Sequence, residues 1–118
     1  MIDRMARVEA MIKREISSIL QEEVNDPRAR DVSITKVEVT RDLKLAKVFY
    51  IPSCGDNKKE DVARGLKRSA SFIRHELAER ISLKFIPRIS FREDVAEEKK
   101  EKIDSIFDRI RKEHTAEE

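Results

Sequence analysis

The residues with the clearest chemical potential in this chain are cations gathered in one segment, residues 58–92. This segment holds ten Lys and Arg against four Asp and Glu, a net charge of +6. Residues 1–57 hold ten of each sign, and residues 93–118 hold six basic and ten acidic residues, a net charge of −4. A positive field confined to one segment favours an anionic partner such as nucleic acid. A solvated helix face is the alternative explanation.

Catalytic and metal-binding sets are missing from the sequence. The histidines are His75 and His114, and the single cysteine, Cys54, has no histidine near it in the chain. One cysteine and two distant histidines do not build a zinc site, and no Gly-rich phosphate loop is present. Carboxylate pairs such as Glu22 and Glu23 are explained by a solvated helix surface. We therefore predict a protein that is not an enzyme and needs no metal or cofactor.

Length and composition bound the remaining possibilities. A chain of 118 residues is one domain with a single core. One unpaired cysteine suits a reducing cytosol, and no apolar run approaches the roughly 18 residues that span a bilayer. The N-terminus has no apolar stretch typical of a secretory signal. We expect a cytoplasmic protein without a membrane partner or a small-molecule substrate.

Hydrophobic periodicity predicts the elements that position the cations. A first helix, capped by Asp3, ends at 25–27 because a residue before proline leaves the helical region. Strands follow near 32–40 and 45–52, with a register break near Thr35 and a turn at 41–43. The apolar stripe of the first helix recurs every three or four residues. Its members are Val8, Ile12, Ile16, Ile19 and Leu20.

The second half begins with a long helical stripe from Val62 to Ile81 that passes the small residues Ser69, Ala70 and Ser71 without losing phase. We predict two helices joined by a kink at these three residues, and a straight continuous helix is the alternative. A last strand follows near 87–93, and Asp94 caps a final helix. That helix has a sparse apolar stripe of Ile103, Ile106, Phe107 and Ile110.

The resulting order is α-β-β-α-(kink)-α-β with an extra C-terminal helix. We therefore predict an α+β fold in which a three-stranded sheet is covered on one face by three helices. Residues 1–110 form the single domain, and 111–118 form a mobile tail that has no apolar anchor. The expected core includes Ile16, Ile19, Val48, Leu66, Ile73, Leu77, Ile89 and Phe91.

The element order is that of type II, or bacterial-type, KH domains, and the details resemble the ribosome-binding factor A family. The similar segments are Asn25-Asp26-Pro27-Arg28 after the first helix, Arg41-Asp42-Leu43 at the turn, Ala46-Lys47-Val48-Phe49 in the second strand, and Phe72-Ile73-Arg74 with Leu83 and Pro87. The resemblance covers roughly residues 5–110. It implies a non-enzymatic, bacterial, RNA-binding factor in ribosome biogenesis that binds the 30S subunit and its 16S rRNA and assists late maturation and rRNA processing.

The chain departs from both patterns at the centre of the basic segment. KH domains hold nucleic-acid backbone with a Gly-x-x-Gly loop, and this chain has only Gly55 and Gly65. The family replaces that loop with an Ala-x-Gly kink, and here the matching positions read Ser69-Ala70-Ser71. Serine resists backbone conformations that glycine permits, but a serine hydroxyl can bond back to the preceding turn and bend a helix.

Candidate RNA-binding residues are the cations that lie off the apolar stripes. Phosphate neutralisation by Lys and Arg supplies affinity with little sequence reading. Aromatic side chains for stacking are few, because Phe49, Phe85, Phe91 and Phe107 are expected in the core, which leaves Phe72 and Tyr50. This favours recognition of a structured RNA by shape and phosphate. The predicted RNA-binding residues are Lys67, Arg68, Arg74, Arg80, Lys84, Arg7, Arg14 and Arg28.

Two functional classes remain open at this point. The first is a monomeric RNA-binding assembly factor for the 30S subunit. The second is a protein-interaction module without RNA binding, such as a homodimer joined through the outer face of the C-terminal helix. A steep fall of RNA affinity with salt distinguishes the first from the second.

Overall fold

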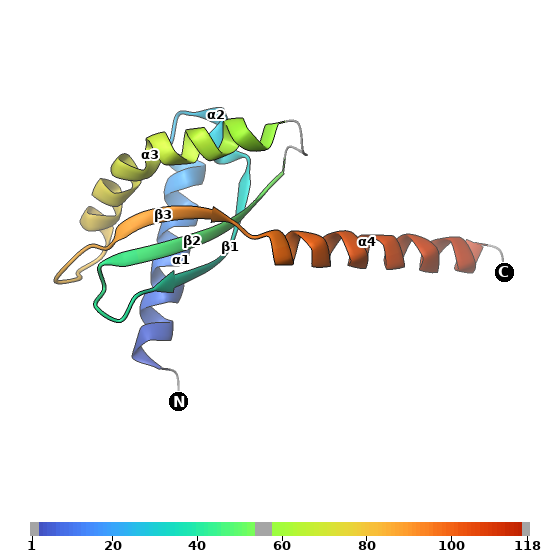
Figure 1. The fold of residues 1–118 in the computed structure, drawn as a ribbon, viewed down its shortest axis with the longest axis horizontal. Helices are drawn as coiled ribbons and strands as arrows, with labels where there is room; N and C mark the ends of the chain where they lie inside the picture. Colours follow the sequence, from blue (N-terminus) through green and yellow to red (C-terminus); the bar gives the residue numbers. More distant parts are fainter. Residues whose placement is uncertain (1–2, 54–57, 117–118) are drawn as a thin grey trace.

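A computed structural model describes residues 3–53 and 58–116 and shows an α+β fold. The elements are α1 (Arg4–Glu22), α2 (Pro27–Arg30), β1 (Val32–Val39), β2 (Leu45–Pro52), α3 (Lys59–Arg80), β3 (Arg88–Glu93) and α4 (Val95–Ala116). Figure 1 shows α1 and α3 against a small sheet, with α4 extending away from them. Cys54, Asp56 and the other residues of 54–57 lie outside the described residues.

The three strands form one sheet in the order β1-β2-β3. The pair β1–β2 is antiparallel, and its register shifts between Ile34 and Lys36, which confirms the predicted break near Thr35. The pair β2–β3 is parallel, with Val48 opposite Phe91. The connection from β2 to β3 runs through α3, because parallel neighbours need a crossover. The predicted strand bounds are confirmed to within one residue.

The core lies between the sheet and the apolar faces of α1 and α3. Helix α1 contacts β1, α3 contacts β3, and the two helices contact each other. Ile12, Ile16 and Ile19 of α1 are fully buried, as are Leu66, Ile73 and Leu77 of α3. The predicted core is confirmed there, whereas Ile89 and Phe91 are only partly buried against it. Asp3 occupies the N-cap position of α1, but its side chain makes no capping bond.

The predicted division of the basic segment into two helices is wrong. Residues Lys59–Arg80 form one unbroken α-helix that passes through Ser69, Ala70 and Ser71. Without a glycine or a proline, nothing at these positions removes a helical hydrogen bond or favours left-handed backbone. Figure 1 nevertheless shows that α3 curves along its length as it crosses the sheet, as helices that wrap a core commonly do.

The short helix α2 was not predicted. Asp26 is its N-cap and accepts a hydrogen bond from the Arg28 N–H at 3.0 Å, and Pro27 stands at the start of the helix, where proline is favoured. Helix α2 packs on α3 at Gly65, where an added Cβ would lie 3.3 Å from Asp26 Oδ2 and from Arg28 Cβ. The absent side chain at Gly65 therefore lets the two helices approach closely.

Helix α4 begins at the predicted cap but does not cover the sheet. Asp94 Oδ1 accepts from the Glu97 N–H at 3.1 Å, and Asp94 Oδ2 accepts from the Thr35 hydroxyl at 2.7 Å. Beyond this anchor α4 leaves the body of the protein (Figure 1). The three helices predicted to cover the sheet were the first helix and the two parts of the kinked pair, and in the structure α1 and the continuous α3 provide this cover. The helix continues through residues 111–116. That 111–118 is mobile stays a prediction.

None of the helices in the described residues is long and apolar enough to cross a membrane.

Candidate nucleic-acid interface

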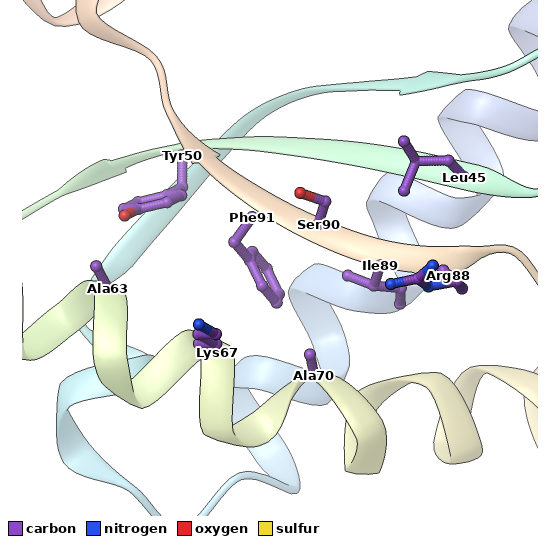
Figure 2. Close-up of a pocket in the computed structure, with 9 residues that line it drawn as sticks. All are labelled: Leu45, Tyr50, Ala63, Lys67, Ala70, Arg88, Ile89, Ser90 and Phe91. Atoms are coloured by element: carbon purple, nitrogen blue, oxygen red, sulfur yellow. The ribbon is translucent and has the colours of Figure 1, made fainter.

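A groove of about 550 Å³ lies between α3 and the edge strand β3. Figure 2 shows Ala63, Lys67 and Ala70 on the side of α3 that faces β3, and Phe91 pointing from β3 toward the helix. The other lining residues are Leu45, Tyr50, Arg88, Ile89 and Ser90. Two of the nine side chains, those of Lys67 and Arg88, are cations. The groove thus offers an apolar floor with positive charge beside it.

The helix periodicity of α3 explains why this face is hollow. Ala63, Lys67, Ala70, Arg74 and Ala78 recur every three or four residues and so share one face of the helix. Three of these five side chains end at Cβ, which leaves space between the helix and β3. The adjacent face carries the buried stripe that fixes α3 on the core. Sequence spacing therefore places small residues and cations together beside the sheet edge.

A second hollow of about 430 Å³ continues along the same face of α3. It is lined by Ser71, Arg74, His75 and Ala78 of the helix, and by Lys84, Phe85 and Ile86 of the segment that leads to β3. Phe85 is 63% exposed, and Lys84 Nζ lies 5.6 Å from the centre of its ring. Together the two hollows bring Lys67, Arg74, Lys84 and Arg88 to one side of the molecule. We call this surface the α3–β3 groove.

Arg74 helps to build the groove. Its Nε donates to the Pro87 carbonyl at 3.3 Å, and its second guanidinium nitrogen donates to the Ile86 carbonyl at 2.9 Å. These bonds fix the start of β3 against α3. Because its acceptors are neutral carbonyls, the charge of Arg74 is not cancelled and still contributes to the field of the groove.

Arg80, which we predicted to face water or RNA, lies against α1. Its guanidinium lies 3.5 Å from Glu15 and 3.6 Å from Glu23 and donates to the Ser18 hydroxyl at 3.0 Å. All three acceptors belong to or follow directly on α1. Arg80 lies off the apolar stripe of α3, but α1 places two carboxylates opposite it. Its charge is therefore used inside the protein, to join α1 and α3.

The remaining predicted cations lie on other surfaces. Arg28 is bonded to Asp26 at 3.1 and 3.2 Å, and these bonds lower the pKa of the Asp26 carboxyl. Arg68 is exposed on α3 and adds a weaker attraction to Asp26. On α1, Arg7 and Arg14 are exposed, and Arg14 lies 3.6 Å from Glu15. None of these four side chains lines the α3–β3 groove.

Sequence reasoning missed Arg88 and misplaced three aromatic residues. Arg88 is the first residue of β3, and its outward position in the strand pattern was the available signal. Phe85 and Phe107 were expected in the core, but they are 63% and 58% exposed. Tyr50, which was expected to be accessible, is only 5% exposed, and burial raises the pKa of its hydroxyl.

Within the described residues, one group of side chains has metal-ligand spacing. The ligand atoms of His75, Glu76 and Glu79 lie within 4.8 Å of one another on α3. His75 and Glu79 are exposed and pair across one helical turn at 3.4 Å, a common arrangement of a solvated helix face. This group gives no reason to revise the prediction that no metal is needed.

Known proteins match this chain over most of its length. The family model for ribosome-binding factor A matches residues 4–107. A ribosome-binding factor A of Clostridium tetani is 44% identical over 110 residues, which cover 92% of this chain and 90% of the relative.

Solved structures share the fold. The crystal structure of ribosome-binding factor A from Thermus thermophilus has a TM-score of 0.69 at 24% identity and covers 77% of this chain and 97% of its own. A homology model of the Thermus protein, fitted into a cryo-EM map of its complex with the 30S subunit, has a TM-score of 0.62 at 24% identity and covers 75% and 92%. From the family match and the Clostridium relative, the chain belongs to the ribosome-binding factor A family.

Proposed function

We propose that this chain is a non-enzymatic, RNA-binding ribosome assembly factor of the bacterial cytoplasm. It binds the free 30S subunit through 16S rRNA and assists late maturation and 16S rRNA processing. Family membership supports this proposal, as does the 30S complex of the Thermus protein with the same fold. The observation that carries it on this chain is the α3–β3 groove, where Lys67, Arg74, Lys84 and Arg88 gather on one surface.

The chemistry of the groove fits an RNA backbone. Among the described residues, Lys67 and Arg88 have no ion-pair partner, so both charges are available to phosphates. Each phosphate contact releases counterions and supplies affinity without reading sequence. The exposed ring of Phe85 provides a surface on which an unpaired base stacks. One exposed ring in a surface of cations suits recognition of a folded RNA by shape more than reading of a single strand.

The test is co-sedimentation of the purified chain with free 30S particles and with 70S ribosomes. We expect binding to the free 30S subunit alone, with an affinity that falls steeply with salt. The double variant Lys67→Glu/Arg88→Glu should weaken binding at least tenfold and flatten the log–log salt slope by about 0.9 for each lost phosphate contact, by analogy with duplex DNA. Both residues lie on the surface, so the variant should fold normally.

Lys112→Glu is the matched control, because Lys112 is an exposed cation near the far end of α4. It should bind 30S particles as the parent does. Equal binding by the parent and the double variant would remove the groove from the proposal. The site would then have to lie around Arg7 and Arg14 of α1. Binding to neither particle would remove the proposed function.

A protein-interaction function has one observation in its favour, the exposed apolar side chains of α4. We propose that this surface makes a second contact, separate from the RNA contact of the groove. We also propose that the chain by itself is a monomer. Sedimentation velocity at increasing concentration tests the second point, because a homodimer would raise the sedimentation coefficient.

A further inference from the structure

Helix α4 exposes a row of large apolar side chains far from the α3–β3 groove. Ile103, Ile106, Phe107 and Ile110 are between 51% and 58% exposed. They stand at positions i, i+3, i+4 and i+7, which one face of an α-helix brings together. We call them the α4 stripe. Four such side chains on a projecting helix are a contiguous apolar surface rather than scattered exposure, and such surfaces mark interaction sites.

The stripe is held out from the body on a fixed base. Asp94 caps α4 and bonds Thr35 of β1 at 2.7 Å. Lys59 at the start of α3 lies 2.9 Å from Glu98 and 3.1 Å from Glu93, and its bond lowers the pKa of the Glu98 carboxyl. The first turn of α4 is thus tied to both β1 and α3. A helix that is already formed and anchored loses less conformational freedom when it binds.

Cations border the stripe along its length. Lys99 precedes Ile103 by four residues and so lies on the stripe side of the helix. Lys102 and Arg109 are seven residues apart and flank Ile106 on one side, while Lys100 lies seven residues before Phe107 on the other. All four are exposed. The acids Glu97, Glu101 and Asp108 lie on the opposite face of α4, whereas the exposed Glu113, three residues after Ile110, stands beside the end of the stripe.

The charges around the stripe limit which kind of partner can cover it. A second copy of the chain would bring one set of bordering cations against another, and like-charge repulsion disfavours such an interface. A lipid surface is a poor fit, because the stripe is only about 10 Å long at 1.5 Å per residue and the polar face of α4 is acidic rather than Lys-rich. RNA offers no apolar cavity for isoleucine side chains.

We propose that α4 docks its stripe into an apolar groove on a protein, and that Asp and Glu side chains rim this groove. The i, i+3, i+4, i+7 spacing is that of a helix laid in a groove, and a rim of carboxylates complements the bordering cations. We place the partner's acidic-rimmed groove on a protein component of the small-subunit particle. This placement rests on the proposed function. The α3–β3 groove would then contact RNA while α4 contacts protein.

The experiment is site-specific photo-cross-linking of the full chain to purified 30S particles. A benzophenone amino acid replaces Phe107 in one sample and Lys112, on the opposite face of α4, in the other. Sedimentation reports how much of each chain is bound. We expect position 107 to cross-link to a ribosomal protein, at a surface where carboxylates surround apolar residues, and position 112 to give no such product.

Two variants sharpen the assignment. In the chain labelled at position 107, Ile103→Ser/Ile106→Ser and, separately, Lys102→Glu/Arg109→Glu should each lower the yield of the protein cross-link about tenfold at equal amounts of bound chain, the scale of a moderate interface anchor. All four residues are exposed, so folding should be unaffected. A Glu101→Gln change on the opposite face should leave the yield unchanged.

The other outcomes overturn the proposal. The bound chain could cross-link only to RNA, only to a second copy, or equally from positions 107 and 112. Each of these results would show that the stripe does not dock into a protein groove, although the chain would still bind the 30S subunit. Stronger capture of the labelled chain by phosphatidylglycerol vesicles than by 30S particles assigns the stripe to lipid. Absence of co-sedimentation rejects the proposed function itself, and this inference with it.

Discussion

Helices α3 and α4 are each 22 residues long and each has an apolar stripe at helical spacing. The stripe of α3 is buried, with Val62, Leu66, Ile73 and Leu77 at most 2% exposed. The stripe of α4 is more than half exposed throughout. Amphipathic spacing thus predicts the helix in both cases, but it does not determine which surface covers the apolar stripe. For α3 that surface is α1 and the sheet, and for α4 it lies outside the chain.

The largest expected effect that tests this contrast is Leu77→Ala. Leu77 is fully buried in the core, so its truncation should lower the free energy of unfolding by about 2–5 kcal/mol through lost transfer energy and the cavity left behind. The matched change Ile106→Ala on α4 should alter stability by about 0.5 kcal/mol or less. Urea denaturation of both variants measures the difference. Equal losses would show that α4 packs against the body in solution.

The next effect compares two cations of α3. Arg80→Ala should cost about 1–2 kcal/mol, because Glu15 and the Ser18 hydroxyl lose a partly buried, charge-assisted partner. Lys67→Ala should change stability by less than about 0.5 kcal/mol while weakening 30S binding. Urea denaturation and co-sedimentation of the same two variants separate the roles. If Lys67→Ala were the more destabilising of the two, the division into structural and binding cations would be wrong.

Local signals in the sequence were sufficient for most elements. Alternation of apolar residues gave the strands, and the opposite phase of Ile34 and Val37 gave the register break. Asp94 was recognisable as a cap because Asp is a preferred residue directly before a helix, and in the structure it accepts from the Glu97 N–H. The buried stripes of α1 and α3 followed from spacing alone. These features depend on neighbours within one turn or one strand pair, which the sequence displays directly.

Features that depend on distant partners were not predictable in the same way. The spacing of α3 puts Arg80 off the apolar stripe, but only the tertiary structure reveals the carboxylates of α1 opposite it. Arg88 belongs to the candidate site because β3 is an edge strand beside α3, which strand pattern alone does not specify. Phe107 was assigned to the core because large aromatic residues are usually buried, and nothing in the sequence shows that α4 leaves the body.

A smaller effect is expected at the base of α4. Asp94→Ala removes the cap and the bond to Thr35, so it should lower stability by about 0.5–2 kcal/mol, whereas Asp94→Asn should retain most of the cap. The Thr35 hydroxyl and then the Glu97 N–H lower the pKa of the Asp94 carboxyl below its ordinary value. A carboxyl with a lowered folded-state pKa stabilises the protein above its ordinary pKa and loses this effect as the pH falls through the folded value.

The difference between the parent and Asp94→Ala should therefore be constant above about pH 5 and shrink below about pH 4. Thermal unfolding of both proteins across this range measures it. A difference that grows on acidification would mean that Asp94 is held protonated, contrary to its two hydrogen-bond donors. If Asp94→Ala kept the parent's global stability but showed faster amide exchange in the first turns of α4, Asp94 would stabilise only the start of this helix.

The smallest effect concerns the bend of α3. Ser71 is an exposed residue inside a continuous helix, so Ser71→Gly should destabilise by about 0.5 kcal/mol because glycine loses more backbone freedom in a helix than serine does. Ser71→Ala should stabilise by a similar amount. A neutral or stabilising Ser71→Gly would show that the bend strains the backbone at this position. The kink predicted from the sequence would then exist as strain within an unbroken helix, and α3 would differ from α4 in its backbone as well as in what covers its stripe.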